Sequence, residues 1–429
     1  MIYVQYFLFV VLLCIIFFNK KVYIYSLVLL IVALNPVVEK LSDKTMYETG
    51  WMNVNFTRAW PELLLVLILL LVYIASKQSK LFHFENDKSL FHSKFFFVIW
   101  FLFSLVAVPS SADPNRSVYL FILAFIGPPL FCRLLIRYYY PYLTNVSFEQ
   151  IILKQISYSV ILFVTVGLIV FYQTGGLESI AGLDLNDTRS KQLLWLGNHG
   201  IQCTIMFLPF LLLQKGMVKY IAIAFFTASL LIGVSRTNFV VVVVTVTIMS
   251  YWKFKLKYIL YAYITGLVLF SLFSVFFTNY AGFLLDRFLG DSSSVITEQI
   301  TDQRVGIWKT ALKIFFDHPW FGSGEGTFYL FNIDKYSDAH NIFFSILCET
   351  GMISFLAFIG FLISLFYWPK FEYSKYFKLG LLAFLVNGFT GNQLFNNSGF
   401  VTGLMAYFFF AFLAVYELFY LRSKLEISN

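Results

Sequence analysis

Long runs of apolar residues, separated by short polar segments, follow one another along most of the chain. A helix that crosses a membrane needs about 20 mostly apolar residues, within a range near 17–25. The runs that approach this length predict thirteen spans, at residues 2–18, 22–38, 60–75, 94–109, 118–137, 151–172, 201–215, 217–234, 237–252, 258–280, 342–368, 377–391 and 399–421. Several runs are short, and those between 201 and 252 leave another division open. The pattern therefore predicts an all-α fold, a polytopic transmembrane helical bundle of about 12–13 spans.

The composition supports a membrane protein. Hydrophobic residues make up 59% of the chain and charged residues only 13%, whereas soluble domains carry about 25% charged residues. This excludes a soluble enzyme, a disordered chain and a disulfide-rich secreted module. The four cysteines lie in or beside apolar runs without metal-ligand spacing, and the first run lacks the features of a cleaved signal peptide. We therefore expect core cysteines and a retained amino-terminal anchor.

The net charge of +8 is a topology signal. Most of the 31 Lys and Arg residues lie in one set of alternating loops, and most of the 23 Asp and Glu residues lie in the other set. Basic loops mark the cytoplasmic side of a membrane protein. We therefore expect the amino terminus outside and the carboxyl terminus inside, with no nucleic acid as a partner, because no basic cluster could follow a phosphate backbone.

Two long polar segments, 173–200 and 281–339, lie on the predicted outer side. Within the second, five apolar residues recur at helical spacing with three basic residues between them: Val305, Trp308, Leu312, Phe315 and Phe316, with Arg304, Lys309 and Lys313. This pattern predicts a short amphipathic helix over 302–317 at the outer membrane interface, with the lysines at lipid headgroups. The chain then divides into a first part of the bundle at 1–280, an outer loop at 281–341 and the last three spans at 342–429.

Three arginines on the outer side are candidates for binding an anion. Arg236 stands between two apolar runs, with the hydroxyls of Ser235 and Thr237 beside it. An arginine at membrane depth costs at least about 2.5 kcal/mol and needs an anion or a route to water. Arg304 begins the amphipathic helix, and its guanidinium can bind two phosphate oxygens at once. Arg287 is a weaker candidate. The alternatives are a snorkelling arginine at 236, an ordinary interfacial charge at 304, and a pairing of Arg287 with Asp286 or Asp291.

Three histidines also lie on the outer side. His340 stands next to Asn341, where the long loop meets the span at 342–368, and an imidazole near its pKa can accept a hydroxyl proton. The alternative for His340 is a hydrogen-bonded interface residue. His318 precedes a proline at a helix end, which favours a structural role. His199 opens a span and is a candidate sugar contact.

Neither a nucleotide nor a metal is indicated. The stretch FGSGEGTF at 321–328 lacks the lysine and the strand-to-helix context of a phosphate loop, so it predicts a sharp turn. No His or carboxylate spacing resembles a ligand set. We therefore expect neither a metal nor a cofactor.

The order of these motifs resembles one known family. The motif residues are Ser235-Arg236-Thr237, then Arg304, Trp308, Ala311, Leu312, His318, Pro319, Gly322, Gly324 and Phe328, then Ala339-His340-Asn341 with Glu349 and Gly351. In this order, and on one side of the membrane, they are similar to the O-antigen ligase and O-antigen polymerase (Wzy-type) superfamily of bacterial membrane glycosyltransferases. The close resemblance covers about 235–360.

The resemblance implies an activity and roles for individual residues. Family members transfer a glycan from undecaprenyl diphosphate to an acceptor sugar at the periplasmic face of the inner membrane, without metal or nucleotide sugar. By position, Arg236 and Arg304 would bind the donor diphosphate, and His340 would sit at the acceptor hydroxyl or orient the donor phosphate. Ser235, Thr237, Arg287, His199 and Asn341 are further candidate substrate contacts. The family usually has about twelve spans, so the predicted count departs from it.

The resemblance leaves the acceptor open. A-H-N followed by an aromatic span, with G-x-G after H-P, favours a polymerase, whose acceptor is another lipid-linked repeat unit. The alternative is a ligase, whose acceptor is the lipid A core. Membrane lipids and a chain-length regulator are the other expected partners. A flippase for lipid-linked glycans and a structural scaffold are rivals of other classes, but the predicted span interiors are nearly free of the charges that a transporter would carry.

Overall fold

The computed structural model describes residues 88–173, 204–233, 236–253, 294–331, 339–367, 371–389 and 400–428, together with 66, 67, 69, 70, 73 and 264. Every regular element within these ranges is a helix, which confirms the all-α prediction. The predicted spans 2–18 and 22–38 lie outside the described residues, and only isolated positions of 60–75 and 258–280 are described.

Contacts divide the chain into two compact units. Unit 1 comprises Met1–Ile152, Asp302–Lys378 and Gly388–Asn429, and unit 2 comprises Leu153–Thr301 and Leu379–Asn387. This division groups segments that are distant in sequence. The three consecutive segments expected from the sequence stay a prediction.

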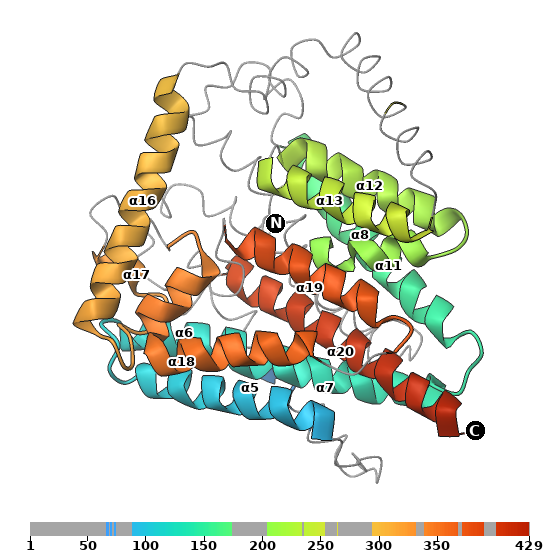
Figure 1. The fold of residues 1–429 in the computed structure, drawn as a ribbon, viewed down its shortest axis with the longest axis horizontal. Coiled ribbons are helices and arrows are strands. Elements are labelled where there is room, and N and C mark those ends of the chain that lie inside the picture. The colour runs from blue at the N-terminus through green and yellow to red at the C-terminus, as the bar shows by residue number, and fades with distance from the viewer. Residues whose placement is uncertain are drawn as a thin grey trace. The chain divides into compact units, whose positions relative to one another are not determined.

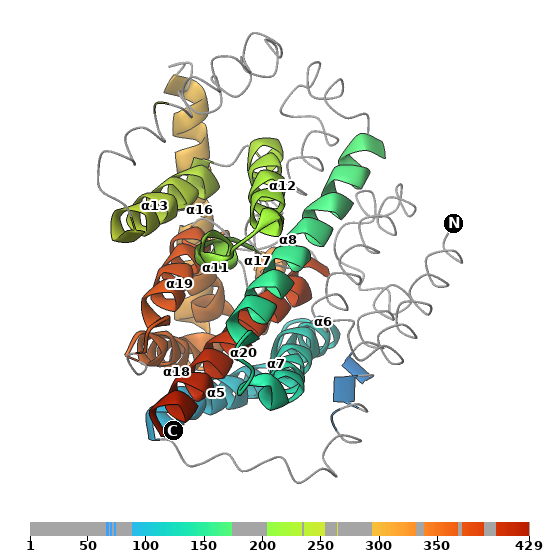
Figure 2. The ribbon, with the colours of Figure 1, turned by 90° about the vertical axis from the view of Figure 1, so that its right-hand side faces the viewer.

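Unit 1 is built on two helix pairs. Its helices are α5 (Lys88–Ala107), α6 (Pro114–Phe121), the π-helix η1 (Ile122–Ile126), α7 (Gly127–Tyr139), the 3-10 helix η2 (Tyr140–Tyr142), α16 (Ser294–Asp317, in this unit from Asp302), α17 (Phe328–Phe331), α18 (Ile342–Phe366) and α20 (Phe400–Ser428). Helices α5 and α18 pack together and are antiparallel, whereas α20 packs along α7 and η1 and runs in the same direction as α7 (Figures 1 and 2). We call the end with Ala107, Pro114 and Ile342 the outer end and the end with Tyr142, Phe366 and Glu426 the inner end, after the sides that the charge pattern predicts.

Local sequence explains the course of the segment from α6 to η2. Asp113 caps α6 by accepting the Arg116 N–H, and Pro114 occupies the first turn, where a missing N–H costs nothing. The π-helix η1 precedes Gly127 and two prolines, which lack N–H groups for the regular ladder. A Cβ on Gly127 would lie 2.1 Å from the Tyr407 hydroxyl oxygen, so this glycine allows α7 to approach α20 closely.

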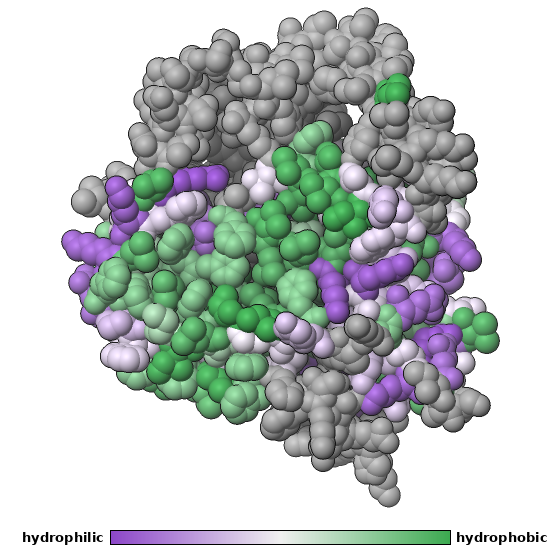
Figure 3. All heavy atoms as spheres, viewed as in Figure 1, coloured by the Kyte–Doolittle hydropathy of each residue, from purple (hydrophilic) through white to green (hydrophobic). Residues whose placement is uncertain are grey.

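Aromatic and small residues fill the seam between α5 and α18. The Trp100 ring lies 4.7 Å from the Phe358 ring and 4.9 Å from the Phe125 ring, measured between centroids. The Ser104 and Ser354 hydroxyls are hydrogen-bonded at 3.1 Å. Such pairs suit helices that meet where water is absent, because each polar group has a partner in the facing helix. Figure 3 shows apolar side chains over the middle of this pair and hydrophilic ones toward its two ends.

Unit 2 contains most of α8 (Phe148–Gln173), the short helices η3 (Ile205–Phe207) and α11 (Leu208–Leu213), then α12 (Met217–Gly233) and α13 (Arg236–Lys253). Helix α11 packs against α12 and α13. Residues Leu379–Asn387 of α19 (Ser374–Gly388) complete the unit. The span expected at 201–215 ends earlier than predicted, because Gln214 is already extended after the short α11.

Three helical segments are long and apolar enough to cross a membrane: Pro114–Tyr142, Ile342–Phe366 and Met405–Glu426. Shorter apolar helices occur at Ser93–Ala107, Met217–Leu230 and Thr237–Trp252. These segments coincide with six of the predicted spans, so a helical membrane protein is confirmed. The full count of 12–13 stays a prediction, because much of the chain lies outside the described residues.

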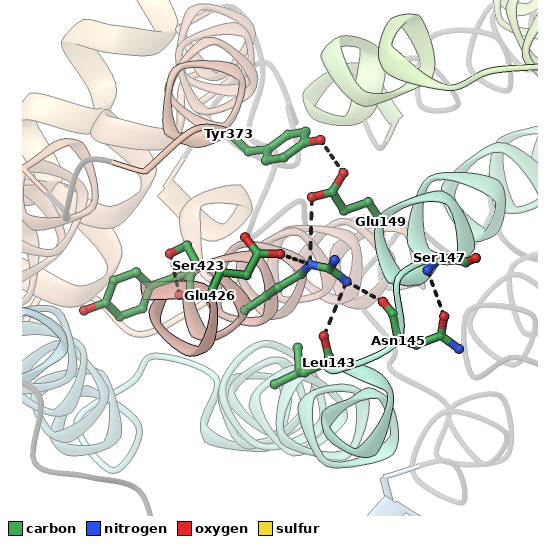
Figure 4. Close-up of polar contacts among 9 residues, drawn as sticks. Leu143, Asn145, Ser147, Glu149, Tyr373, Ser423 and Glu426 are labelled. Atoms are coloured by element: carbon green, nitrogen blue, oxygen red, sulfur yellow. Dashed lines mark hydrogen bonds and ion pairs between the residues drawn. The ribbon is translucent and has the colours of Figure 1, made fainter. Parts of the chain in front are cut away.

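A polar junction closes the inner end of unit 1 (Figure 4). The Arg422 guanidinium on α20 donates to the carbonyls of Leu143 at 3.3 Å and Asn145 at 2.6 Å. It also meets the Glu426 carboxylate at 2.9 Å and the Glu149 carboxylate at 3.9 Å. Tyr373, which precedes α19, donates its hydroxyl to Glu149. This Arg422 junction joins three chain segments that the charge pattern predicts to lie on the same side of the membrane.

Candidate functional site

The outer end of unit 1 is organised around a break in α18. Gly351 inside this helix has φ 81° and ψ 178°, which is not helical and favours glycine. The break leaves two carbonyls and one N–H group of α18 without their helical hydrogen-bond partners. Backbone groups of the loop at 318–327 take the place of those partners. Ser323 N donates to the Cys348 carbonyl at 3.0 Å and Gly324 N to the Glu349 carbonyl at 2.9 Å. In return, Met352 N donates to the Pro319 carbonyl at 2.9 Å.

Glycines permit this contact between backbones. A Cβ on Gly322 would lie 2.3 Å from the Glu349 carbonyl carbon, and one on Gly351 would lie 2.2 Å from the Trp320 carbonyl oxygen. Gly322 and Gly324 also have positive φ, at 70° and 100°. The G-x-G and E-x-G motifs therefore form one structural joint. We call it the glycine joint, formed by the 318–327 loop and residues 348–352 of α18. The sharp turn predicted over 321–328 is confirmed.

Helix α16, which carries Arg304, leads at its Asp317 end into this joint. Its inner side is a row of buried apolar residues, Ile307, Ala311, Ile314 and Phe315, which pack with Phe328, Ala339 and Cys348. The predicted amphipathic helix is confirmed, although it begins at Ser294 rather than 302. Of the predicted apolar residues, Phe315 is buried in this cluster and Trp308 packs against it, whereas Val305 and Phe316 are exposed. The predicted position at the membrane interface stays a prediction.

Arg304 is half-buried, and its positive charge is partly removed from water. Burial lowers the pKa of its guanidinium from the ordinary value, because the charged form loses contact with water. Arginine nevertheless keeps its charge. Within the described part of the chain, no carboxylate lies within ion-pair distance of Arg304. An anion arriving here would therefore meet a partly desolvated fork of N–H donors.

His340 is held in an unusual backbone conformation. Its φ is 47°, in the left-handed region, which non-glycine residues seldom adopt and which clusters at functional sites. Buried residues fix it on both sides: Ala339 belongs to the apolar cluster on α16, and Asn341 caps α18. The imidazole itself is half-buried. The strain is therefore maintained by its neighbours.

Asn341 has a structural role that the sequence did not suggest. Its side-chain oxygen accepts the N–H groups of Phe343 at 2.9 Å and Phe344 at 3.3 Å. Its side-chain nitrogen donates to the Phe389 carbonyl at 3.2 Å. The amide thus begins α18 and ties it to the chain beyond α19. Its expected contact with substrate stays a prediction.

The same apolar cluster connects Arg304 to His340. Ile307, one turn after Arg304, packs in the cluster that contains Ala339, and the Trp308 ring lies 5.5 Å from the Phe344 ring. A residue that follows Arg304 on α16, Trp308, therefore contacts a residue that follows His340 on α18, Phe344, and both lie within unit 1.

The other candidates lie in unit 2 or outside the described residues. Arg236 is the first residue of α13, and the half-buried Thr237 follows it. Ser235, Arg287 and His199 lie outside the described residues. Because Arg236 belongs to unit 2 while Arg304 and His340 belong to unit 1, the convergence of all three stays a prediction.

Sequence reasoning missed a polar cluster beneath the glycine joint. Arg116 on α6 is only 3% exposed, and its guanidinium lies 4.5 Å from the centre of the Tyr329 ring. The Tyr329 hydroxyl donates to the Asp113 carboxylate at 3.0 Å, and the Glu349 carboxylate accepts the Phe328 N–H at 3.2 Å. The charged pair DPNR at the start of an apolar run was the available signal.

Glu325 is the most deeply buried acid of this cluster. It is 1% exposed, and its carbonyl accepts the Ser117 hydroxyl at 2.7 Å. Burial raises the pKa of the Glu325 carboxyl well above its ordinary value, and the neighbouring Glu349 raises it further. We therefore expect Glu325 to be protonated near neutral pH, which avoids two buried negative charges side by side. Among the described residues, no group of three or more His, Cys, Asp or Glu could hold a metal ion.

Comparison with known proteins identifies the domain that contains these residues. Residues 221–359 match the family model of O-antigen ligase, and this match covers 139 of the 429 residues. It includes α13 with Arg236, α16 with Arg304, and the glycine joint with His340. No curated protein sequence matches the chain. The family match supports the resemblance indicated by the motifs: residues 221–359 of the chain are similar to the O-antigen ligase family.

Proposed function

We propose that this membrane glycosyltransferase moves a glycan from undecaprenyl diphosphate to an acceptor sugar at the periplasmic face of the bacterial inner membrane. Its acceptor is another lipid-linked repeat unit, which makes it an O-antigen polymerase. The observation that carries the proposal is that Arg304, half-buried without a carboxylate partner among the described residues, and the strained His340 each stand near residues of one apolar cluster, Ile307 and Ala339.

The residues divide the reaction between them. The acceptor hydroxyl oxygen attacks the anomeric carbon as the bond from that carbon to the diphosphate breaks. His340 takes the hydroxyl proton, which makes the acceptor oxygen a better nucleophile. The diphosphate leaves with the bonding electron pair, and Arg304 and Arg236 stabilise its growing negative charge more than that of the intact donor. The fixed position of His340 would remove part of the entropic cost of bringing two lipid-anchored substrates together.

Purified protein in lipid nanodiscs, given the lipid-diphosphate-linked repeat unit and a chelator, tests the proposal. We expect longer lipid-linked chains. Arg304→Ala and Arg236→Ala should each abolish most of the chain growth, and Arg304→Lys should restore only part of it, because an ammonium keeps the charge but lacks the planar fork. Full activity of both alanine variants would contradict the diphosphate assignment, and a requirement for a metal would contradict metal-independent transfer.

A ligase is the second candidate, because the matching family model is described as O-antigen ligase. The same assay with lipid A core as acceptor separates the two activities. In a strain that lacks the gene, a surface polysaccharide of single repeats indicates a lost polymerase, and bare core indicates a lost ligase. Movement of the lipid-linked glycan across vesicles without transfer would instead support a flippase.

A further inference from the structure

Helix α16 has a second face that does not pack on protein. Phe316 is 72% exposed, Trp320 just beyond the helix end is 63% exposed, and Val305 is also exposed. Lys309 and Lys313 are exposed between them. The spacing of 305, 309, 313 and 316 places these residues along one side of the helix, apart from the buried row of Ile307, Ala311 and Ile314, and Trp320 follows in the turn after the helix.

This face continues onto the exposed apolar side of α5, which is a predicted membrane span. The Phe321 ring, next to Trp320, is stacked on the Phe103 ring of α5, with 6.4 Å between their centres. Leu102 and Val106, which flank Phe103 on α5, are large apolar residues with exposed side chains. The Phe321 side chain therefore extends the exposed apolar surface of α5.

The direction of α16 relative to α5 and α18 also agrees with a position at the membrane surface. In Figure 1, α16 runs across the outer ends of α5 and α18 rather than alongside them. A helix that crosses the end of membrane spans lies along the membrane surface. Helices in this position place apolar and aromatic residues into the headgroup boundary and basic residues at its charged level.

We propose that the face formed by Val305, Lys309, Lys313, Phe316 and Trp320 docks on the membrane surface and binds the headgroups of anionic phospholipids. The two lysines supply positive charge at the phosphates, and the aromatic residues enter the boundary between headgroups and acyl chains. Lipid is favoured over a protein partner because the aromatic surface is continuous with the exposed apolar side of α5, a predicted membrane span. The docking is independent of glycan transfer, because it concerns only where α16 lies.

Photo-crosslinking in nanodiscs tests this docking with the full-length chain. Phe316 or, as the control, Thr310 is replaced by p-benzoyl-phenylalanine. Thr310 lies on the same helix, six residues before Phe316, and therefore points away from the proposed face. Mass spectrometry then measures lipid adducts. We expect several-fold more phospholipid adduct from position 316 than from position 310. Equal yields at the two positions, or protein adducts alone at 316, would overturn the docking.

A second arm tests the anionic headgroup. Nanodiscs of mixed phosphatidylglycerol and phosphatidylcholine should give adducts at position 316 that are enriched in phosphatidylglycerol. The Lys309→Gln, Lys313→Gln double variant should lose most of that enrichment while still forming lipid adducts. Enrichment that is absent from the start, or unchanged in the double variant, would contradict the role of the lysines. Thermal unfolding of each variant confirms that it is folded, since these exposed side chains contribute little to packing.

Discussion

The two ends of unit 1 are held together by different forces. At the outer end, the glycine joint connects a loop to α18 through backbone hydrogen bonds and two glycines that allow contact between backbones. At the inner end, the Arg422 junction connects three segments through charged side chains (Figure 4). Backbone bonds in a buried joint fix positions closely and are little affected by salt, whereas exposed ion pairs adapt and are screened. The rigid end is the one that carries Arg304 and His340.

The largest expected effect comes from adding one carbon to the glycine joint. Gly351→Ala and Gly322→Ala would each place a Cβ within 2.3 Å of backbone atoms at a positive φ. We expect each to lower the stability of the fold by about 2–4 kcal/mol, from strain and overpacking combined. Thermal unfolding in detergent measures this effect.

The matched control for the joint is Gly306→Ala, at an open position on α16. It should be neutral or stabilising by up to about 1 kcal/mol, because alanine is the better helix former. If the two joint variants were as stable as this control, the outer end would not be rigid in the way described.

The next largest effect is expected at the helix cap beside His340. Asn341→Ala removes the acceptor for two N–H groups and the donor to the Phe389 carbonyl. We expect a loss of about 1–2 kcal/mol. Asn341→Asp keeps the acceptor and loses the donor, so its unfolding midpoint should fall between those of the wild type and the alanine variant. A midpoint equal to the wild type in both variants would argue against the cap.

A smaller, pH-dependent effect is expected from Glu325. Its folded pKa is raised above the unfolded value, so its share of stability is complete below the unfolded pKa and is lost as pH rises toward the folded pKa. Glu325→Gln stays neutral at every pH. As the pH rises above the ordinary range of a carboxyl pKa, the variant should therefore lose less thermal stability than the wild type. Parallel losses in the two proteins would contradict the burial of a protonated acid.

The smallest effect is expected at the inner end. Arg422→Gln removes ion pairs to Glu149 and Glu426, and the side chain of Glu426 is 58% exposed. After allowance for solvent screening we expect a loss of at most about 1 kcal/mol, and this loss should shrink in high salt. Unfolding midpoints at low and high salt measure it, and a large loss that salt does not change would remove the contrast between the ends.

The spans were predictable because hydropathy is a local property. Predicted spans at 217–234, 237–252 and 342–368 correspond to helices Met217–Gly233, Arg236–Lys253 and Ile342–Phe366. Their boundaries differ by one or two residues, because capping and polar flanks can be read directly from the sequence.

The packing of α16 was only partly predictable. Helical spacing identified the helix, but the chain offers two apolar sectors, one with Phe316 and one with Ile314. Periodicity alone cannot tell which sector faces α18, because that depends on the position of residues such as Ala339 and Cys348. The predicted set included residues of both sectors, with Phe315 in the buried one and Phe316 in the exposed one.

The residue types of the candidate site were predictable from the sequence, but the backbone contacts that hold them in place were not. Arg304 and His340 stand out by residue type and motif. The joint beneath them was not visible, because it pairs loop residues with a helix break that only a glycine φ reveals. Arg116 was missed for a related reason: its neighbour Tyr329 is more than two hundred residues away in sequence.

The most direct test of the central claim compares one arginine from each end in the glycan transfer assay. The outer end is proposed to carry the chemistry, so Arg304→Ala should lower kcat/KM at least about a hundredfold, as expected for a lost charge-stabilising donor. Arg422→Gln should leave kcat/KM within about twofold of the wild type, because half-exposed ion pairs contribute little. Equal effects of the two substitutions, or a larger effect of Arg422→Gln, would contradict the account.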